Sequence, residues 1–159
     1  MQAPQHLDVR PAAAEDVPAI SAMQKASLPE TYGPFLGRPA VEEFIAGGNV
    51  DRYFDANWQH ASVATIGGEI VGVAVLIGNL LDLIWVKPSL RSEGIGSALI
   101  EAVERQAALE SSELTLEVWA VNGRAVAFYD RLGFSVGGTV ADPLTNLEKL
   151  VMRKTLRPT

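Results

Sequence analysis

The sequence predicts a single α/β domain in which helices flank a mixed β-sheet. Segments with apolar residues at helical spacing alternate along the chain with runs rich in valine and isoleucine, as in α/β folds. One such run returns through Gly67-Gly68 as a hairpin, and a later run leads through a glycine-containing loop into an amphipathic helix. No linker, internal repeat or low-complexity tract divides the 159 residues, so one domain over 1–159 is expected.

The first part of the chain is expected to be mainly helical. Residues 7–10 alternate like a short strand, and a helix that opens over 14–18 places Val17, Ile20, Met23 and Ala26 or Ser27 on one face. Residues 28–38 contain two prolines and two glycines beside Tyr32 and Phe35, and this composition predicts a loop. Two short helices are predicted next, over residues 39–45 and 50–58.

The second part of the chain is expected to supply the sheet and two longer helices. Strands are predicted over 62–66, 69–77, 80–86, 114–119, 134–140 and 147–156, with a helix after Gly96 and another over 122–132 that stops at Gly133. The helix after Gly96 places Ile95, Ala98, Leu99, Ala102, Val103 and Gln106 or Ala107 on one face. The sheet is therefore expected to be antiparallel at first and parallel across that helix.

Charge and composition argue against several classes of function. The formal charge of −6 and the sequence pI of about 4.9 argue against binding to nucleic acid or to an anionic membrane, whereas they suit a cationic amine. No stretch approaches the roughly 20 apolar residues of a membrane span, and residues 1–6 do not resemble a leader, so a cytoplasmic location is expected. The chain has no cysteine and its two histidines are isolated, so no metal site and no cysteine nucleophile are expected.

The stretch from Val86 to Leu99 is typical of a phosphate-binding loop. It consists of the end of an apolar strand, a loop that contains Gly94 and Gly96, and the start of a helix. Because glycine lacks a Cβ, the backbone there can approach a ligand closely. Unpaired amides at the start of the helix then favour an anion.

The loop Arg91-Ser92-Glu93-Gly94-Ile95-Gly96 resembles the signature loop of the GCN5-related N-acetyltransferases (GNAT), which is Gln or Arg, two variable residues, Gly, any residue, and Gly or Ala. Upstream, Leu83 to Pro88 is similar to the strand that these enzymes place beside the pantetheine arm of coenzyme A. Downstream, Asn122 and the run Phe128 to Phe134 look like the second block of the family. The resemblance covers almost the whole chain and is closest to the ribosomal-protein N-terminal acetyltransferases, which place a glutamate at the position of Glu117.

The resemblance implies transfer of an acyl group, with acetyl preferred, from acetyl-CoA to a primary amine by direct attack in a ternary complex without a metal. It also implies a sheet that is splayed in the middle, where the backbone pairs with pantetheine. Tyr129 is implied to protonate the leaving thiolate, and Glu117 to take a proton from the ammonium of the acceptor. The cofactor ligands that it implies are Ile84, Trp85, Val86, Arg91, Ser92, Glu93, Gly94, Ile95, Gly96, Ser97, Asn122 and Tyr129.

Some residues depart from the family pattern or have a plainer interpretation. Ser92-Glu93 stands where relatives often carry a basic residue, so Glu93 is expected to point away from the pyrophosphate and Arg91 to be the only nearby cation. Four of the implied site residues also have a purely structural interpretation. Arg91 would then cap the loop and Asn122 would cap its helix. Tyr129 would pack in the core, and Glu117 would face outward from its strand. Trp85 and Trp119 are expected to pack on the sheet.

Three alternative functions account for part of the same residues. A dinucleotide-binding fold is disfavoured because Leu99 replaces the third glycine, although Glu117 lies about 20 residues after Gly96. The others are a module that binds acyl-CoA without turnover and a protein N-terminal acetyltransferase. Since residues 141–146 lack the tyrosines that the latter often carry in this loop, a small-molecule amine is preferred over a protein N-terminus or lysine. Tyr32, Phe35, the two short helices before Trp58 and this loop are expected to bound the acceptor, and the oligomeric state stays open.

Overall fold

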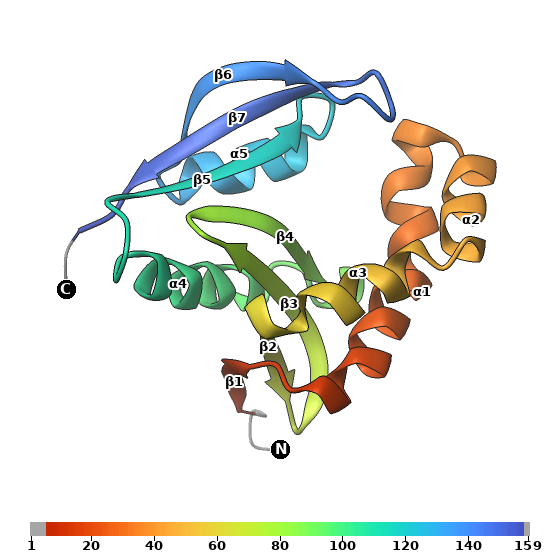
Figure 1. Ribbon diagram of the computed structural model, residues 1–159, viewed down its shortest axis with the longest axis horizontal. Coiled ribbons are helices and arrows are strands. Elements are labelled where there is room, and N and C mark those ends of the chain that lie inside the picture. The colour runs from red at the N-terminus through yellow and green to blue at the C-terminus, as the bar shows by residue number, and fades with distance from the viewer. Residues whose placement is uncertain (1–5, 158–159) are drawn as a thin grey trace. The chain divides into compact units, whose positions relative to one another are not determined.

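The computed structural model describes residues 6–157 (Figure 1). Residues 1–5, which entered the expectation about a leader, lie outside this range. The chain forms two compact units: the first comprises Met1–Val75 and Leu83–Ala102, and the second comprises Leu76–Asp82 and Val103–Thr159. Within the described residues, no helix is both long enough and apolar enough to cross a membrane.

One open sheet of seven strands runs through the fold in the order β1-β2-β3-β4-β5-β7-β6. Its strands are β1 (Leu7–Pro11), β2 (Ala61–Ile66), β3 (Glu69–Ile77), β4 (Leu80–Val86), β5 (Glu113–Trp119), β6 (Ser135–Ala141) and β7 (Glu148–Thr155). β1 pairs with β2, β2 with β3, β5 with β7 and β6 with β7 in antiparallel register, whereas β4 and β5 are parallel. The predicted mixed and mostly antiparallel sheet is confirmed. The doubly wound alternative is excluded, because β5 continues into an antiparallel partner rather than a second parallel one.

Three helices of the first unit are packed together (Figure 1). They are α1 (Val17–Leu36), α2 (Arg38–Ala46) and α3 (Asn49–Asn57), with short 3₁₀ turns at Ala14–Asp16, Trp58–His60 and Pro88–Leu90. Ile20, Phe54, Val63, Val73 and Trp85 belong to the core of this unit and are at most 5% exposed. β3 is buried at every position from Ile70 to Leu76, so both faces of this strand are covered.

The predicted loop over residues 28–38 is wrong. The chain stays helical to Leu36 with both Pro29 and Pro34 inside α1, and the helix ends only at Gly37, where φ is 86°. Each proline removes one backbone donor and disfavours the helix. Packing overrides this local preference, because Leu28 is 3% exposed and the helix is flanked by α2 and α3.

The second unit contains β5, β7 and β6, with α5 (Gly123–Arg131) between β5 and β6. α4 (Ile95–Ala107) is shared between the two units. The predicted buried face of α4 is confirmed at Ile95, Leu99, Val103 and Ala107, and Ile100 is also buried at 1% exposure. The packed face of α4 is therefore wider than the single stripe that helical spacing predicts.

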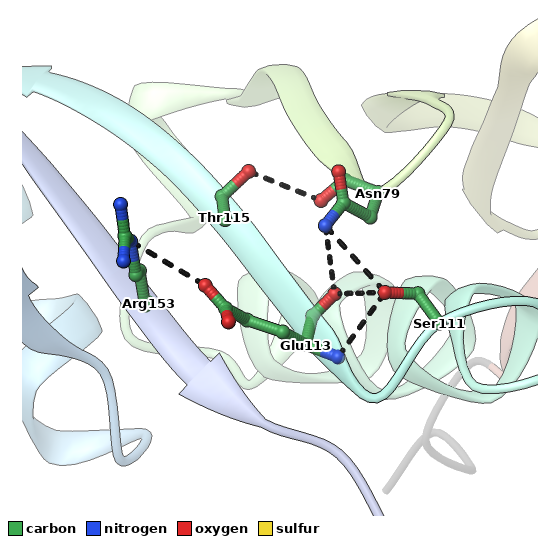
Figure 2. A network of polar contacts seen from close by, with 5 residues as sticks. All are labelled: Asn79, Ser111, Glu113, Thr115 and Arg153. Atoms are coloured by element: carbon green, nitrogen blue, oxygen red, sulfur yellow. Dashed lines mark hydrogen bonds and ion pairs between the residues drawn. The ribbon is translucent and has the colours of Figure 1, made fainter.

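A polar network fixes the start of the parallel pair of strands (Figure 2). The Asn79 carbonyl accepts bonds from the backbone N–H of Thr115 at 2.9 Å and from its hydroxyl at 3.3 Å. The Asn79 amide donates to the Glu113 carbonyl at 3.2 Å, and Ser111 Oγ donates to the same carbonyl at 2.9 Å. The parallel register itself consists of Leu80 opposite Thr115 and Leu81 opposite Leu116.

Candidate active site

The predicted phosphate-binding loop joins β4 to α4 in the first unit. The first helical hydrogen bond that the loop makes is from Ala98 N–H to the Gly94 carbonyl at 3.0 Å. The amides of Ile95, Gly96 and Ser97 precede that bond and so have no partner within the helix. Together with the positive end of the helix dipole, these three amides can bind an anion.

Gly94 leaves open space at this point of the loop. Its φ is +83°, and a Cβ built there would have no neighbour within 4 Å. The glycine is therefore required by the backbone conformation and not by packing against the protein. Ser92, Glu93 and Gly94 are all exposed, and Ser92 also has a positive φ, of 70°. A bound group can therefore approach the loop from solvent.

Two cations lie near the loop in the sequence, and their surroundings differ. Lys87 forms an ion pair with Glu69 at 2.7 Å, so its charge is largely balanced. Arg91 donates from Nη2 to the hydroxyl of Thr31 on α1 at 3.3 Å. The charge of Arg91 also acts on Tyr32: burial raises the pKa of this phenol, and Arg91 partly offsets the rise.

The end of β4 is anchored to α1. Trp85 is 5% exposed and donates from Nε1 to the Ser27 hydroxyl at 2.9 Å, and its ring packs edge-on against Tyr32 at 5.3 Å between centroids. The predicted packing role of Trp85 is confirmed. Its neighbours Ile84 and Val86 are half-buried. The Trp85 side chain therefore points into the core, which leaves its backbone as the group that can serve a cofactor.

Gly72 on β3 was not predicted to matter for this site, although it determines how closely three elements meet. A Cβ at this position would lie 3.0 Å from Leu99, 3.1 Å from Ile95 and 3.2 Å from the Trp85 carbonyl. The missing side chain thus lets the start of α4 and the end of β4 approach β3. A glycine inside an apolar strand is the sequence signal that could have revealed this close approach.

Glu117 lies on β5 in the second unit and is not buried. Its side chain is 42% exposed and lies 3.5 Å from Nζ of Lys149 on β7, which is 28% exposed. The outward-facing position, one of the two interpretations of Glu117 from the sequence, is the one observed. Its neighbours Leu116 and Val118 point into the core while Glu117 points the other way, as strand alternation requires.

Asn122 lies at the start of α5, and Tyr129 lies within this helix. Asn122 is the N-cap residue, and its Oδ1 accepts a bond from Ala125 N–H at 3.4 Å, so its predicted capping role is confirmed. Tyr129 is 8% exposed, with its ring 5.4 Å from that of Phe128 and 5.8 Å from that of Phe134. These contacts hold the phenol ring in a defined orientation.

Asp142 organises the connection between β6 and β7. It is 7% exposed, accepts bonds from Trp119 Nε1 at 3.1 Å and from Leu144 N–H at 3.0 Å, and thereby fixes the loop. Burial raises the pKa of Asp142, but these hydrogen bonds, a bond with Thr145 and the charge of Lys149 lower it below its ordinary value overall. Trp119 was expected to pack on the sheet, and in the structure its indole N–H also anchors this loop.

The structure thus gathers the residues from Ile84 to Ser97 in the first unit and Glu117, Asn122 and Tyr129 in the second. His6 and His60 are exposed. Between residues 6 and 157, no group of three or more His, Cys, Asp or Glu side chains could hold a metal ion.

Residues 57–136 match the model of the acetyltransferase (GNAT) domain, and this segment contains both the loop and Tyr129. A peptidyl-lysine N-acetyltransferase of Salmonella typhimurium, YjaB, is 37% identical over 70 residues. The match covers 44% of this chain and 46% of that protein, so it spans about half the length of this curated relative.

Two solved structures with the same fold align with nearly the whole chain. A GCN5-related N-acetyltransferase of Rhodopseudomonas palustris matches with a TM-score of 0.80 at 24% identity, over 98% of this chain and 99% of that one. The PaiA N-acetyltransferase of Thermoplasma acidophilum, solved in complex with coenzyme A, matches with a TM-score of 0.79 at 18% identity, over 94% and 99% of the two chains. The loop, the strand order and the match over 57–136 lead to one conclusion: this chain belongs to the GNAT acetyltransferase domain family.

Proposed function

We propose that this chain transfers an acetyl group from acetyl-CoA to a primary amine, by direct attack of the amine in a ternary complex. The observation that carries the proposal is the loop before α4. Three helix-start amides, the open space at Gly94 and the guanidinium of Arg91 occur in the segment that matches the GNAT family model. Among the 159 residues there is no cysteine on which an acyl group could be carried.

The residues present fit coenzyme A. Its diphosphate needs hydrogen-bond donors and positive charge, which the amides of Ser92 to Ser97 and Arg91 supply. Glu93 is exposed and can turn toward solvent, away from an anion. Backbone groups of Ile84, Trp85 and Val86 would pair with the pantetheine amides as an added strand does, and the Asn122 side chain is a further candidate ligand. Acetyl-CoA supplies an activated thioester.

Glu117 is the proposed base. A carboxylate that is partly exposed can accept a proton from an ammonium that arrives from solvent, either directly or through water. The carboxylate of Glu117 lies 3.5 Å from Nζ of Lys149 on the neighbouring strand.

Tyr129 is the proposed acid. A phenol is neutral at pH 7 and can donate its proton to the departing thiolate. Packing of the ring against Phe128 and Phe134 restricts its motion and so reduces the entropy cost of placing the hydroxyl.

Two classes of acceptor remain in the proposal. The loop over residues 141–146 carries no tyrosine, which favours a small-molecule amine as the sequence predicted. The relative that is named a peptidyl-lysine N-acetyltransferase favours the lysine of a polypeptide as the second candidate. A net charge of −6 suits a cationic acceptor of either class.

The test is release of free thiol from acetyl-CoA by the purified protein in the presence of an amine panel. The panel contains polyamines, amino acid amides and lysine peptides with free or blocked N-termini. Thiol release that requires both protein and amine, with acetylated product found by mass spectrometry, supports the proposal. Tight binding of acetyl-CoA with no thiol release for any amine would instead identify a sensor module.

The proposed loop has its own test. Gly94→Val places a branched side chain in the open space and strains a backbone with φ of +83°, so coenzyme A binding measured by calorimetry should be lost. Gly68→Val is the matched control, because Gly68 has the same φ of +83° and also has open space around a Cβ. If both variants are folded and bind coenzyme A equally well, the loop does not hold the diphosphate.

A further inference from the structure

A lysine of the same chain lies beside the proposed base. Lys149 is on β7, and its Nζ is 3.5 Å from Oε1 of Glu117 on β5. Glu117 stands opposite Val151, and Lys149 precedes Val151 by two residues, so the two side chains are diagonal neighbours on one face of the sheet. A primary amine, the kind of group that the proposed function requires as acceptor, is therefore already in place beside Glu117.

The same face of the sheet carries a second ion pair with the same geometry but a different cation. Thr155 stands opposite Glu113, and Arg153, two residues before Thr155, lies with Nε 3.4 Å from the Glu113 carboxylate (Figure 2). A guanidinium keeps its proton and does not attack a carbonyl, whereas the amine of a lysine becomes a nucleophile once a neighbouring base removes its proton. Of these two pairs, the one at Glu117 is the pair whose cation can be acetylated.

The four lysines of the chain differ in how firmly their ammonium groups are held. Lys149 approaches Glu117 to 3.5 Å, and among the described residues it donates no hydrogen bond to this carboxylate. The other three each donate a hydrogen bond to a carboxylate at 2.7 to 3.1 Å: Lys25 to Asp51, Lys87 to Glu69 and Lys154 to Glu104. The ion pair of Lys149 is therefore the loosest of the four.

The position of the proposed base determines where the thioester has to arrive. If Glu117 takes the proton of an acceptor, the carbonyl carbon of acetyl-CoA must come within bonding distance of an amine beside this carboxylate. Lys149 stands beside Glu117 before any acceptor arrives from solvent. Its reaction therefore has the advantage of an intramolecular step, in which the nucleophile and the base are already held together.

We infer that the chain acetylates itself on Lys149, an inference that rests on the proposed function. Glu117 takes a proton from the ammonium of Lys149, and Nζ forms a bond to the acetyl carbon of the thioester. The carbon–sulfur bond breaks, and the thiolate of coenzyme A leaves with a proton donated by Tyr129. The ammonium loses two protons in forming the amide: one leaves through Glu117, and the other balances the proton that the thiol gains.

Acetylation removes a charge that acts on two features of the second unit. An acetylated lysine is neutral, so the ion pair with Glu117 is lost. The charge of Lys149 is also one of the causes that lower the pKa of Asp142, the buried carboxyl that fixes the β6–β7 loop. Self-acetylation therefore changes the electrostatics both at the proposed base and at the loop that is expected to bound the acceptor.

The test is incubation of the full chain with acetyl-CoA and no added amine, followed by mass spectrometry of the intact protein and of its peptides. A single acetyl group per chain is expected, on Lys149, and thiol release should stop after this one turnover. Sustained release still requires an added amine. Because the transfer occurs within one chain, its rate constant at saturating acetyl-CoA should not depend on protein concentration.

Four variants connect the modification to the proposed machinery. Glu117→Gln should slow acetylation of Lys149 about 10²- to 10⁴-fold, whereas Glu113→Gln, at the matched ion pair, should leave the rate unchanged. Lys149→Arg keeps the positive charge and removes the acceptor, so no acetyl group should be incorporated. Lys154→Arg makes the same replacement on the same strand, and this variant should be acetylated at Lys149 like the original chain.

Each failure has a distinct outcome. A purely chemical reaction would modify Lys25 and Lys87, whose side chains are 33% and 35% exposed, at least as fast as Lys149, which is 28% exposed, and it would proceed without Glu117. That pattern, or an unmodified Lys149 in a chain that acetylates amines of the panel, refutes self-acetylation and leaves the proposed function standing. A rate constant that rises with protein concentration would show transfer between copies and refute transfer within one chain. If neither Lys149 nor any amine is acetylated, the proposed function fails as a whole and this inference fails with it.

Discussion

At the scale of single residues, a substitution of Glu117 distinguishes a catalytic role of this carboxylate from a role in a surface ion pair. If Glu117 takes the proton of the acceptor, Glu117→Gln should lower turnover about 10²- to 10⁴-fold at neutral pH. The loss should shrink as the pH rises toward the pKa of the amine, because the acceptor then arrives deprotonated. The measurement is kcat against pH on the best acceptor of the panel.

The chain offers a matched control for that experiment. Glu113 lies on the same strand and the same face as Glu117 and is also paired with a β7 cation, Arg153, at 3.4 Å. Glu113→Gln should leave the pH profile unchanged. Equal profiles for both variants and the original chain would assign Glu117 to the surface ion pairs of this sheet face.

Tyr129 is the second residue whose role a single substitution can decide, here by removal of the phenolic oxygen. Tyr129→Phe keeps the packing against Phe134 and removes the proton donor, so affinity for acetyl-CoA should change little. A lost general acid predicts a fall in kcat of about 10²- to 10⁴-fold and disappearance of the alkaline limb of the rate profile. The readout is kcat from pH 6 to 10, with Tyr53→Phe on α3 as the control. Near-normal turnover with the alkaline limb intact would make Tyr129 a packing residue.

At the scale of elements, the sequence predicted most of the architecture. Apolar runs and helical spacing located all seven strands and all five helices, because burial leaves a pattern of apolar residues in the sequence. The exception is α1 after Leu28, where Pro29 and Pro34 predict a break that packing against α2 and α3 prevents. The amino-acid composition of the segment itself does not reveal that α2 and α3 pack against it.

In the candidate site, too, features that depend on local sequence could be predicted and features that depend on packing could not. The loop from Arg91 to Gly96 and the cap at Asn122 could be predicted because each depends on residues that are close in sequence. The bond of Thr31 to Arg91 and that of Trp119 to Asp142 could not, since they join segments that only the folded chain brings together. The sequence left the exposure of Glu117 open, because apolar neighbours on a strand do not reveal which face is covered.

Gly72 provides a prediction at the scale of packed elements. Gly72→Ala places a methyl group 3.0 to 3.2 Å from side chains of α4 and from the Trp85 carbonyl, so the elements must move apart. Overpacking of this kind costs about 1–3 kcal/mol of stability. Chemical denaturation should therefore show a lower midpoint than for Gly138→Ala, a β6 glycine at which a Cβ meets nothing within 4 Å. Equal midpoints would mean that the close approach at Gly72 relaxes without cost.

At the scale of the whole molecule, each unit contains one buried aspartate that ties a connection to the sheet. In the first unit, Asp16 accepts a bidentate contact from Arg10 at 2.8 and 3.0 Å and a bond from Ala13 N–H at 2.7 Å. In the second unit, Asp142 fixes the β6–β7 loop. The hydrogen bond from Arg10 lowers the pKa of Asp16 below its usual 3.8 despite burial, and the pKa of Asp142 is lowered as well.

These two pKa shifts predict how the stability of the chain depends on pH. A carboxylate whose pKa is lower in the folded state stabilises the fold fully above its ordinary value of 3.8 and loses that effect as the pH falls through the lowered pKa. Asp16→Asn and Asp142→Asn should each reduce the free energy of unfolding by about 1–2 kcal/mol at pH 7, after allowance for the partly exposed Arg10. In urea titrations, that difference from the original chain should narrow below pH 3.8 and vanish once the aspartate is protonated in the folded state.

Asp55→Asn, at an exposed position of α3, should change stability by less than about 0.5 kcal/mol at any pH. A difference between either variant and the original chain that stays constant from pH 7 to pH 2 would show that shape, and not charge, makes these aspartates stabilising.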